Sequence, residues 1–288
     1  MAFGFAAHTT GLIVARAGIA PGLRRYLDDF AAAYCDAVEV ASAMDVHATA
    51  FARRARRADV LIAIDAAQRD LAAAIGAHFV PCFPDPGLAL RDGRIAGASA
   101  SSRAAAQPPL VRVCVFGPES TGKTTLAAAL ARHYGTVHAT EYVRGYLDVT
   151  GNAGTLDDVP WIARGQRAAE IASAQQANRA LVCDTNLATI LLWSEVLFGT
   201  APPWLRDAAL CQTYDLWLLT GIDVPFEPDP QRCFPNPADR ARLMAACEAM
   251  LVRLGVVPVR VTGSHDERMA TACAALDRLL AERDRIAH

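Results

Sequence analysis

The chain has 288 residues, of which 53% are hydrophobic and 20% are charged, and its formal net charge is −2. This length predicts one large or two modest globular domains, and the near-neutral charge excludes the basic surface typical of nucleic-acid-binding proteins. No apolar run reaches the roughly 18 residues that a membrane-spanning helix needs, and no basic segment precedes the apolar N-terminus as it would in a signal peptide. The eight cysteines are scattered, without a Cys-x-x-Cys pair. We therefore expect buried, reduced thiols in a cytoplasmic protein that binds neither nucleic acid nor membrane.

The first hundred residues carry few structural signals. Residues 59–64 (Asp-Val-Leu-Ile-Ala-Ile) predict a strand, and an alanine-rich helix is expected after it. Residues 97–109 are small and polar and end in two prolines, which is the composition of a linker. The sequence therefore predicts a boundary near residue 107, with one domain over residues 1–107 and a second over residues 108–288.

The second domain opens with a phosphate-binding motif. Residues 117–124 (Gly-Pro-Glu-Ser-Thr-Gly-Lys-Thr) match G-x-x-x-x-G-K-[ST] in full, and Lys123 is the single lysine among 28 basic residues. The motif requires a strand before it and a helix after it. Residues 111–116 are a short, β-branched and mostly apolar run, and residues 124–134 are rich in alanine and leucine, with Gly135 behind them as a helix stop. Both flanks agree with a phosphate-binding loop, or P-loop.

This motif predicts a site for ATP and Mg²⁺. Backbone N–H groups of a loop opened by Gly117 and Gly122 would surround the phosphates, and the following helix would add its N-terminal dipole. A compact ammonium fits beside the β- and γ-phosphates, so Lys123 is expected there, with the Thr124 hydroxyl on the metal. The other ATP-binding residues expected in the motif are Glu119, Ser120, Thr121 and Thr125. The alternative is a glycine-rich turn that binds no ligand.

Strands and helices alternate after the P-loop. Strands are expected at residues 136–140, 181–184, 215–220 and 256–262, and helices at residues 160–180, at residues 186–198, after Pro237 and from residue 264 to the C-terminus. This alternation predicts an α/β fold with a parallel sheet of about five strands and helices on both faces. In such a sheet the ligand lies at the carboxyl ends of the strands.

Two carboxylates follow strands of the expected sheet. Glu141 comes after the second strand and Asp184 ends the third. Asp184 has the position of a Walker B acid, which holds Mg²⁺ directly or through water, and Glu141 could accept a proton from a substrate hydroxyl. Each has an alternative role: Asp184 as the N-cap of the next helix, and Glu141 in a surface ion pair with Arg144.

The segment of residues 224–237 contains five prolines and predicts a stiff loop, here called the proline-rich loop. A loop that brings an arginine over the phosphates neutralises charge in the transition state of phosphoryl transfer and excludes water. Arg232 is the candidate, and Arg240 and Arg242 on the following helix are weaker ones. The alternative for Arg232 is a solvated position, because loops are polar by default.

Six segments stand in a distinctive order: GPESTGKTTLAAAL (117–130), EYVRGYL (141–147), WIARGQ (161–166), ANRALVCDTNLATILLWSEVLFG (177–199), YDLWLLTGIDVPFEPDPQR (214–232) and VTGSH (261–265). Together they closely resemble the ribosylnicotinamide kinase domain of NadR-type proteins, over about residues 110–285. The resemblance departs from the family at one point. The family lid usually reads Asp-Gly-x-Arg, whereas Asp229 to Arg232 here read Asp-Pro-Gln-Arg.

The resemblance implies a P-loop kinase-type fold and transfer of the ATP γ-phosphate to the 5′-hydroxyl of nicotinamide riboside, giving nicotinamide mononucleotide in NAD biosynthesis. The catalytic residues implied are Lys123, Glu141 as general base, Asp184 and Arg232. Residues expected at the substrate are Glu141, Tyr142, Arg144, Trp161, Gln166, Asp184 and Asn186. Tyr146 and Trp193 are further stacking candidates for the nicotinamide ring, and each aromatic residue has a role in the core as its alternative.

The N-terminal region resembles a NadR-type protein only in part. In that family a nicotinamide mononucleotide adenylyltransferase domain with an H-x-G-H motif and a later I-S-x-T-x-x-R signature precedes the kinase. Residues 4–11 and 97–103 only partly match these two motifs, and the second histidine of the H-x-G-H motif is missing. We expect a shortened, Rossmann-like nucleotidyltransferase-like domain that has lost adenylyl transfer, with no helix-turn-helix segment before it.

Two other functions stay open from the residues. The substrate could be a different nucleoside, because the P-loop and Arg232 contact only phosphates. The domain could also be a non-catalytic, ATP-dependent switch, with residues 1–107 sensing a pyridine nucleotide or binding a partner. The sequence leaves the oligomeric state open.

Overall fold

The computed structural model describes residues 10–15, 21–35, 37–42, 60–63, 72–73, 77–82, 110–151 and 154–287. These residues group into two compact units. The second unit holds the described residues between 98 and 141, 155–160 and 177–287, and the first holds the rest. The expected boundary at residue 107 and the linker at residues 97–109 lie outside the described residues and stay predictions.

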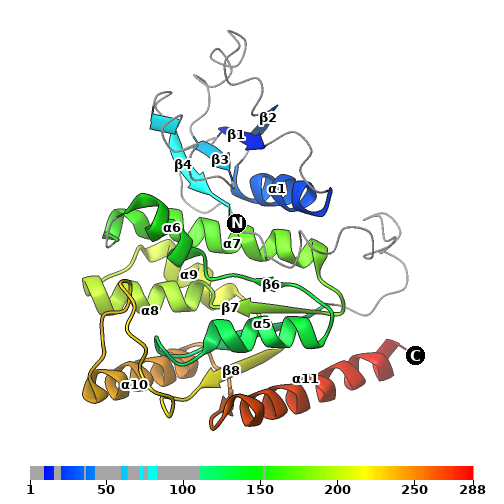
Figure 1. Cartoon of the computed structure of the whole chain (residues 1–288), viewed down its shortest axis with the longest axis vertical. Helices are drawn as coiled ribbons and strands as arrows, with labels where there is room; N and C mark the ends of the chain where they lie inside the picture. The colour runs from blue at the N-terminus through cyan, green and yellow to red at the C-terminus, as the bar shows by residue number, and fades with distance from the viewer. Residues whose placement is uncertain are drawn as a thin grey trace. The chain divides into compact units, whose positions relative to one another are not determined.

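The second unit is built on a five-stranded parallel sheet (Figure 1). Its strands are β5 (Val111–Phe116), β6 (His138–Ala139), β7 (Ala180–Asp184), β8 (Leu216–Thr220) and β9 (Val259–Val261), in the order β6-β7-β5-β8-β9. All neighbouring pairs are parallel, so their carboxyl ends lie at one edge. The predicted α/β fold and its sheet are confirmed, and the P-loop strand is central.

β8 begins one residue later than predicted, and two strands are shorter by three or more residues, each for a local reason. β6 begins at His138 because the Thr136 side chain, rather than a backbone ladder, joins this segment to β7: its hydroxyl donates to the Ala180 carbonyl at 2.6 Å and accepts from the Asn178 N–H at 2.9 Å. β9 begins only at Val259 because Pro258 lacks an N–H group for the ladder.

The helices of this unit include two predicted capping glycines. α5 (Lys123–His133) ends where Gly135 adopts a φ of 60°, and the Thr136 N–H returns to the Ala131 carbonyl at 2.9 Å, as in a Schellman cap. α8 (Leu187–Phe198) ends at Gly199 with a φ of 69°. The other elements are the 3₁₀ turn Leu156–Asp158, α9 (Pro203–Cys211), α10 (Pro237–Arg253) and α11 (His265–Ala287). α9 was not predicted from the sequence.

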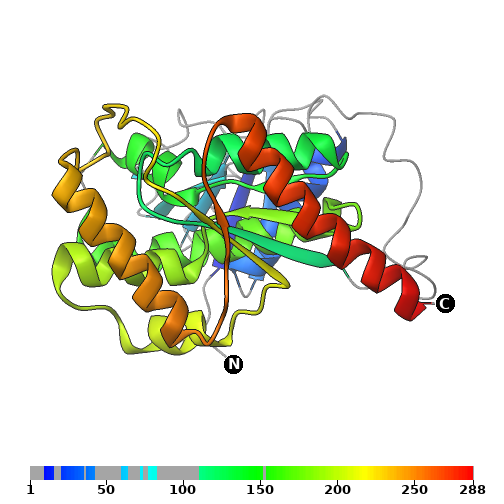
Figure 2. The same cartoon turned by 90° about the horizontal axis from the view of Figure 1, so that it is seen from below.

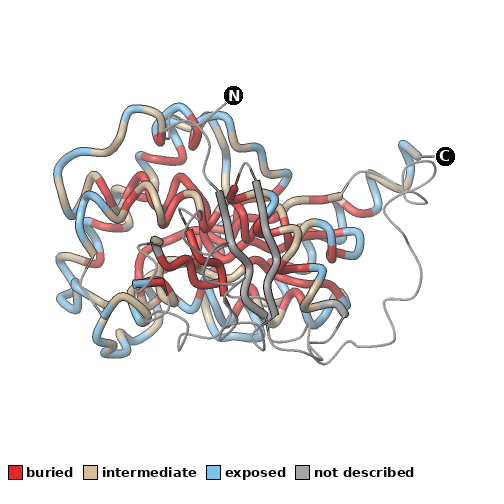
Figure 3. The backbone as a smooth tube through the Cα atoms, turned by 90° about the horizontal axis from the view of Figure 1, so that it is seen from above, coloured by how far each residue is buried: buried red, intermediate tan, exposed pale blue. Residues whose placement is uncertain are grey.

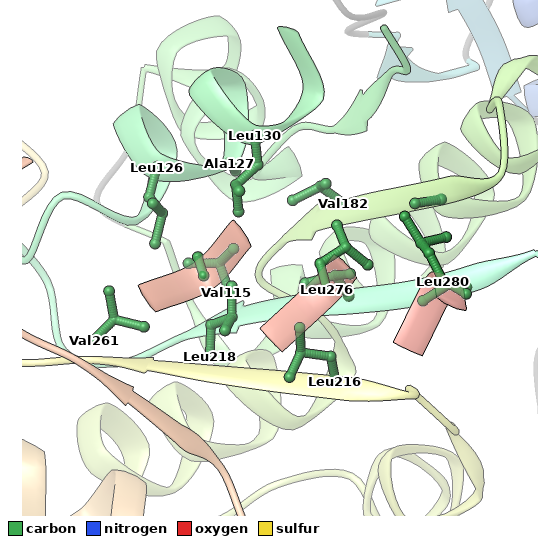
Figure 4. Close-up of a cluster of buried hydrophobic side chains, with 14 residues drawn as sticks. Val115, Leu126, Ala127, Leu130, Val182, Leu216, Leu218, Val261, Leu276 and Leu280 are labelled. Carbon is green, nitrogen blue, oxygen red and sulfur yellow. The ribbon is translucent and has the colours of Figure 1, made fainter. Parts of the chain in front are cut away.

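The core of the second unit lies between the sheet and the helices α5 and α11. Figure 4 shows Leu126 and Leu130 of α5 and Leu276 of α11 over Val115 of β5 and neighbouring strand residues. α11 runs obliquely along the sheet (Figure 2). The side chains that alternate with Val115, such as Phe116, are also buried, so both faces of the sheet are covered (Figure 3). This double burial explains why β5 is apolar at every position except the partly exposed Arg112.

The first unit carries a four-stranded parallel sheet in the order β2-β1-β3-β4. Its elements are β1 (Thr10–Ala15), α1 (Pro21–Tyr34), β2 (Ala37–Ser42), β3 (Val60–Ala63), β4 (His78–Pro81), α6 (Tyr142–Thr150) and α7 (Val159–Gln176), of which the last begins in the second unit. The strand predicted at residues 59–64 is confirmed as β3. The expected alanine-rich helix after it falls mostly outside the described residues.

Helix α6 was not predicted, and its aromatic residues explain its place in the first unit. Tyr142 and Tyr146 are each 1% exposed, and the Tyr142 ring stacks on Phe30 of α1 with the centroids 6.1 Å apart. Gly165 of α7 lets the helices approach, because a Cβ there would lie 2.2 Å from the Tyr142 ring. Tyr142 and Tyr146 thus contribute to the core of this unit.

Two expectations about the chain as a whole can be compared with the structure. All eight cysteines are free, but Cys211 and Cys233 are exposed and Cys273 is partly exposed, so the expectation that all are buried was wrong. Cys211 lies at the end of α9, Cys233 in the proline-rich loop and Cys273 on α11 against the core cluster, whereas Cys114 and Cys183 lie within strands. Within the described part of the chain, no helix combines the length and apolarity needed to cross a membrane.

Candidate functional site

The P-loop connects β5 to α5 and depends on its two glycines. Gly117 has a φ of 145°, and a Cβ on it would lie 2.4 Å from the Thr220 hydroxyl at the end of β8. Gly122, the residue before α5, has a φ of 78°. Side chains are strongly disfavoured at both positions, the first by contact and the second by backbone conformation. The loop is therefore a turn at the start of a helix, with the geometry that the motif predicts.

The conformation of the P-loop is stabilised by hydrogen bonds from two of its own side chains. The Lys123 ammonium donates to the Pro118 carbonyl at 2.6 Å, and Lys123 is only 8% exposed. The Thr121 hydroxyl donates to the same carbonyl at 2.7 Å and lies 2.7 Å from the Thr220 hydroxyl. Thr121 was predicted to bind ATP, and its side chain is occupied within the protein. Thr124 and Thr125 are exposed at the start of α5.

Asp184 ends β7 in a strained turn. Thr185, the next residue, has a φ of 71°, which a β-branched residue rarely adopts. Asn186 is extended, and its side chain caps α8 by accepting from the Thr189 N–H at 3.0 Å. The cap of α8 is therefore Asn186, so the alternative role proposed for Asp184 is filled by another residue. Asn186 itself was predicted to bind substrate.

The Asp184 carboxyl group is fully buried, and neither oxygen has a hydrogen-bond partner. Burial and the nearby Glu141 carboxylate raise its pKa from 3.8 to about 6, while Thr124, Lys123 and His138 act in the opposite direction. The Thr124 hydroxyl lies close enough to lower the pKa of Asp184, although the two groups do not meet in a regular hydrogen bond. Two carboxylates, one ammonium and one hydroxyl thus converge beside the P-loop.

This set of groups fits a divalent cation. A buried carboxylate without a hydrogen-bond donor is costly unless a positive charge accompanies it. Among the described residues, no group of three or more His, Cys, Asp and Glu side chains is arranged to hold a metal ion. Mg²⁺ beside phosphates needs only one or two protein ligands, since phosphate and water oxygens complete its shell. Thr124 and Asp184 are the residues suited to that task.

The proline-rich loop is fastened to the P-loop by Glu119 and Ser120. Both Glu119 carboxylate oxygens accept from the Cys233 N–H, at 3.0 and 3.2 Å, and one accepts from the Phe234 N–H at 2.6 Å. The Ser120 hydroxyl accepts from the Glu227 N–H at 2.8 Å. Both P-loop residues were predicted to bind ATP, yet their side chains hold this loop. The sequence motif leaves these positions variable, so it gave no signal of this role.

Arg232 lies against the P-loop and not in solvent. One terminal nitrogen, Nη1, donates to the Ser120 hydroxyl at 3.2 Å and to the Glu227 carbonyl, and the buried Nε has no hydrogen-bond partner. Arg240 of α10 donates to the Ser120 carbonyl at 3.3 Å. Two arginines therefore meet the P-loop at one residue, and the second was only a weak candidate from the sequence.

Aromatic contacts fix the far end of the proline-rich loop. The Phe234 ring stacks on Trp193 of α8 with the centroids 6.0 Å apart, and the Arg242 guanidinium lies 5.6 Å from the Phe234 centroid. Trp193 was a candidate surface for stacking a substrate ring, and in this structure it packs on the loop.

Arg268 is a buried residue of the site that sequence reasoning missed. It lies in the first turn of α11, and its guanidinium donates to the Thr121 carbonyl of the P-loop at 2.7 Å. The VTGSH segment (residues 261–265) gave the nearest signal, but it stops three residues earlier.

Four residues predicted at the substrate belong to the first unit: Tyr142, Arg144, Trp161 and Gln166. Gln166 is 1% exposed, and its side-chain oxygen accepts from the Tyr142 N–H at 2.9 Å. Tyr142 and Gln166 thus have structural roles within this unit, in keeping with the core alternative for Tyr142. Their part in substrate binding stays a prediction, as does the Glu141–Arg144 alternative.

Comparison with known proteins gives three kinds of match. The profile of the family described as AAA domain matches residues 112–268. The "Trifunctional NAD biosynthesis/regulator protein NadR" of Escherichia coli (strain K12) is 27% identical over 177 residues, covering 60% of this chain and 43% of the relative. The protein of the same name from Salmonella typhimurium is 26% identical over 175 residues, with 59% and 43% coverage. The match thus spans less than half the length of these relatives.

Solved structures show distant likeness. A NadR protein in complex with NR has a TM-score of 0.49 and 14% identity, covering 95% of this chain and 97% of that chain. A thymidylate kinase from Ehrlichia chaffeensis has a TM-score of 0.44 and 14% identity, covering 60% of this chain and all of that chain.

Proposed function

This chain belongs to the family described as AAA domain, and from that premise we propose that it is an ATP-dependent kinase that phosphorylates the 5′-hydroxyl of nicotinamide riboside. The observation that carries the proposal is the pair of carboxylates, Glu141 and Asp184, beside Lys123 and Thr124 of the P-loop. A phosphate-binding loop alone supports nucleotide binding. Transfer to a hydroxyl also needs a base and a cation site next to the phosphates, and this pair supplies candidates for both.

The P-loop would bind the phosphates of ATP. The N–H groups at the start of α5 have no intrahelical acceptors, and the helix dipole favours negative charge there. Lys123, which donates to the Pro118 carbonyl in this structure, would turn its ammonium to a β- or γ-phosphate oxygen. Thr124 and Asp184 would hold Mg²⁺, which when bound neutralises negative charge on the phosphates.

The transfer step would use Glu141 and Arg232. The 5′-oxygen forms a bond to the γ-phosphorus, the bond from that phosphorus to the β,γ-bridging oxygen breaks, and ADP leaves. The hydroxyl proton moves to a carboxylate oxygen of Glu141, which is partly exposed. Arg232, with its partnerless buried Nε, would donate to the phosphoryl oxygens as charge builds on them.

Nicotinamide riboside as the substrate rests on sequence resemblance. The six ordered segments resemble ribosylnicotinamide kinase domains, and the matched relatives are named as NAD biosynthesis proteins. Tyr142, Arg144, Trp161, Gln166 and Asn186 are proposed as its further contacts. The product would be nicotinamide mononucleotide.

An assay of nucleoside-stimulated ADP release tests this function. The purified chain is incubated with ATP, Mg²⁺ and one nucleoside from a panel that includes nicotinamide riboside, uridine, thymidine and adenosine. We expect ADP release only with nicotinamide riboside, together with one equivalent of nicotinamide mononucleotide by mass spectrometry. The Lys123→Ala variant is the control for a contaminating kinase. ADP release with another nucleoside would assign that nucleoside as the substrate in place of nicotinamide riboside. ATP binding without ADP release in the presence of any nucleoside would favour a non-catalytic switch.

A further inference from the structure

The guanidinium of Arg268 joins three loops at the carboxyl edge of the sheet. Nη1 donates to the Thr121 carbonyl at 2.7 Å, Nε to the Gly263 carbonyl at 2.9 Å, and Nη2 to the Gly221 carbonyl at 3.3 Å. Nη2 also forms an ion pair with Asp223 at 2.7 Å. Thr121 follows β5, Gly221 follows β8 and Gly263 follows β9, so one side chain bridges the ends of three neighbouring strands.

The surroundings leave this side chain little freedom. The Arg268 side chain is 5% exposed, and the Gly263 N–H donates to the second Asp223 oxygen at 2.6 Å. A Cβ on Gly221 would lie 2.4 Å from an Asp223 oxygen of its own loop and 2.7 Å from Thr262 Cγ2 of the loop after β9, so the two loops meet too closely there for a larger residue. Burial opposes the charge of Asp223, but hydrogen bonds from Gly263 and Arg268 outweigh it and lower the pKa of Asp223. Asp223 therefore stays ionised near neutral pH.

The contact with Thr121 acts on the part of the P-loop that faces the phosphates. In a trans peptide the C=O and the following N–H point in opposite directions. The Thr121 carbonyl points at Arg268, so the Gly122 N–H points away from Arg268. Gly122 has a φ of 78° and directly precedes the first residue of α5. A guanidinium has five N–H donors in one plane, enough to bind three carbonyls and a carboxylate from one position. An ammonium has only three donors and cannot bind all four acceptors.

We propose that Arg268 is a positioning residue that holds the P-loop in its phosphate-binding conformation by tying it to the loops after β8 and β9. The inference deepens the proposed function but needs only its first part, the binding of ATP at the P-loop. Arg268 acts on nucleotide affinity through the backbone, without a part in proton or phosphoryl transfer. A residue that merely stabilised the fold would leave the nucleotide affinity of the folded protein unchanged.

The test compares ADP affinity and unfolding in matched variants. Arg268→Lys keeps the charge and loses the fork, Arg268→Gln loses both, and Arg278→Gln changes an exposed arginine of the same helix. ADP dissociation constants are measured by calorimetry with Mg²⁺, well below the unfolding temperature of each variant. We expect both Arg268 variants to bind ADP at least about tenfold more weakly and the Arg278 variant to stay within about twofold of wild type. In kinase assays the KM for ATP should rise with little change in the KM for the nucleoside.

Folded Arg268 variants that bind ADP as wild type does would overturn the proposal, even with a lowered unfolding temperature. If neither Arg268 variant folds, the Asp223→Asn variant tests the proposal instead. It removes the charge of the ion pair with Arg268 and keeps the hydrogen bonds from Arg268 to the three carbonyls. Here we expect about threefold weaker ADP binding, and unchanged binding overturns the proposal. A wild-type protein that binds ADP but lacks nucleoside-dependent turnover would count against the proposed function alone, since the ADP measurement needs no nucleoside.

Discussion

The Ser120 hydroxyl at the tip of the P-loop accepts a hydrogen bond from Arg232 Nη1 at 3.2 Å. The two residues are 112 positions apart in the chain, and the contact brings a guanidinium of the proline-rich loop onto the loop that binds phosphates. A guanidinium held by one neutral hydroxyl and one carbonyl can exchange these acceptors for charged phosphoryl oxygens, which bind it more strongly. Arg232 thus already contacts the P-loop, where the phosphoryl oxygens are proposed to bind.

The Arg232→Gln substitution is expected to lower kcat by about 10³-fold, because arginines that neutralise a transferring phosphoryl group contribute effects of this size. Affinity for ADP should change by less than about threefold, because ADP lacks the group that the arginine serves. Steady-state kinetics and calorimetry separate the two. Arg206→Gln, at an arginine whose side chain is 53% exposed, is the control. A kcat within twofold of wild type in the Arg232 variant would remove this residue from the mechanism.

The Glu119→Ala substitution is expected to free the proline-rich loop. It removes the acceptor for the Cys233 and Phe234 N–H groups, so these two amides should exchange with solvent faster in hydrogen-exchange mass spectrometry. We expect kcat/KM to fall by about tenfold, because charge-assisted hydrogen bonds to a carboxylate are roughly twice as strong as neutral ones. Glu119→Gln keeps an oxygen acceptor, so its amide exchange rates and its kcat/KM should lie between those of wild type and of Glu119→Ala. Unchanged amide protection in the alanine variant would contradict this role for Glu119.

The parts of the site that the sequence predicted are those with a local signal. The spacing of Gly117, Gly122 and Lys123 defines a turn before a helix, and the position of Asp184 at the end of an apolar run places it at the carboxyl edge of a parallel sheet. Gly135 and Gly199 mark helix ends because their φ values are positive, which few other residues tolerate. Each of these predictions depends only on neighbours in the chain.

The parts that the sequence did not predict depend on residues far apart in the chain. Arg268 reaches Thr121 over 147 positions and Glu119 reaches Phe234 over 115, and no local pattern distinguishes these side chains from surface charges. Helix α9 begins at Pro203, directly after Pro202, and a pair of prolines indicates a turn as readily as a helix start. The burial of two residues predicted at the substrate, Tyr142 and Gln166, was also not predicted. It results from packing between helices, which the EYVR and WIARGQ segments do not reveal.

The Glu141→Gln substitution is expected to abolish turnover and leave ADP binding within about twofold of wild type. An amide cannot accept the proton of the substrate hydroxyl, and loss of a general base costs about 10²–10⁴-fold in rate. Single-turnover measurement of phosphorylated nucleoside reports the chemical step directly. Glu248→Gln, at an exposed ion pair with Arg260, supplies the matched control. Retained turnover in the Glu141 variant would assign the base to another group.

The pH dependence of the protein should report Asp184, whose pKa is raised from 3.8 to about 6 mainly by burial. Between these two values the folded state holds a proton that the unfolded state has released, so its contribution to stability decreases as pH rises from about 4 to 6. Chemical unfolding of the nucleotide-free protein across this range measures the slope, and Asp184→Asn should flatten it. Activity should change in the opposite direction, because the proposed Mg²⁺ site needs the ionised Asp184 carboxylate. We expect kcat/KM to rise through about pH 6, and a flat profile between pH 5 and 7 would contradict it.

The Lys123→Arg substitution tests whether the single lysine is required for its shape as well as its charge. The ammonium lies 2.6 Å from the Pro118 carbonyl in a position only 8% exposed, beside the buried Cys247 thiol of α10. A guanidinium is wider and presents its donors in a fixed plane, so it cannot occupy this space and also reach a phosphate oxygen without displacing the loop. We expect kcat/KM to fall by at least about 10²-fold and ADP binding to weaken, with an unfolding temperature close to that of Lys123→Ala. Because every other basic residue of the chain is an arginine, the substitution follows the composition of the protein, and an active variant would show that charge alone is sufficient at this position.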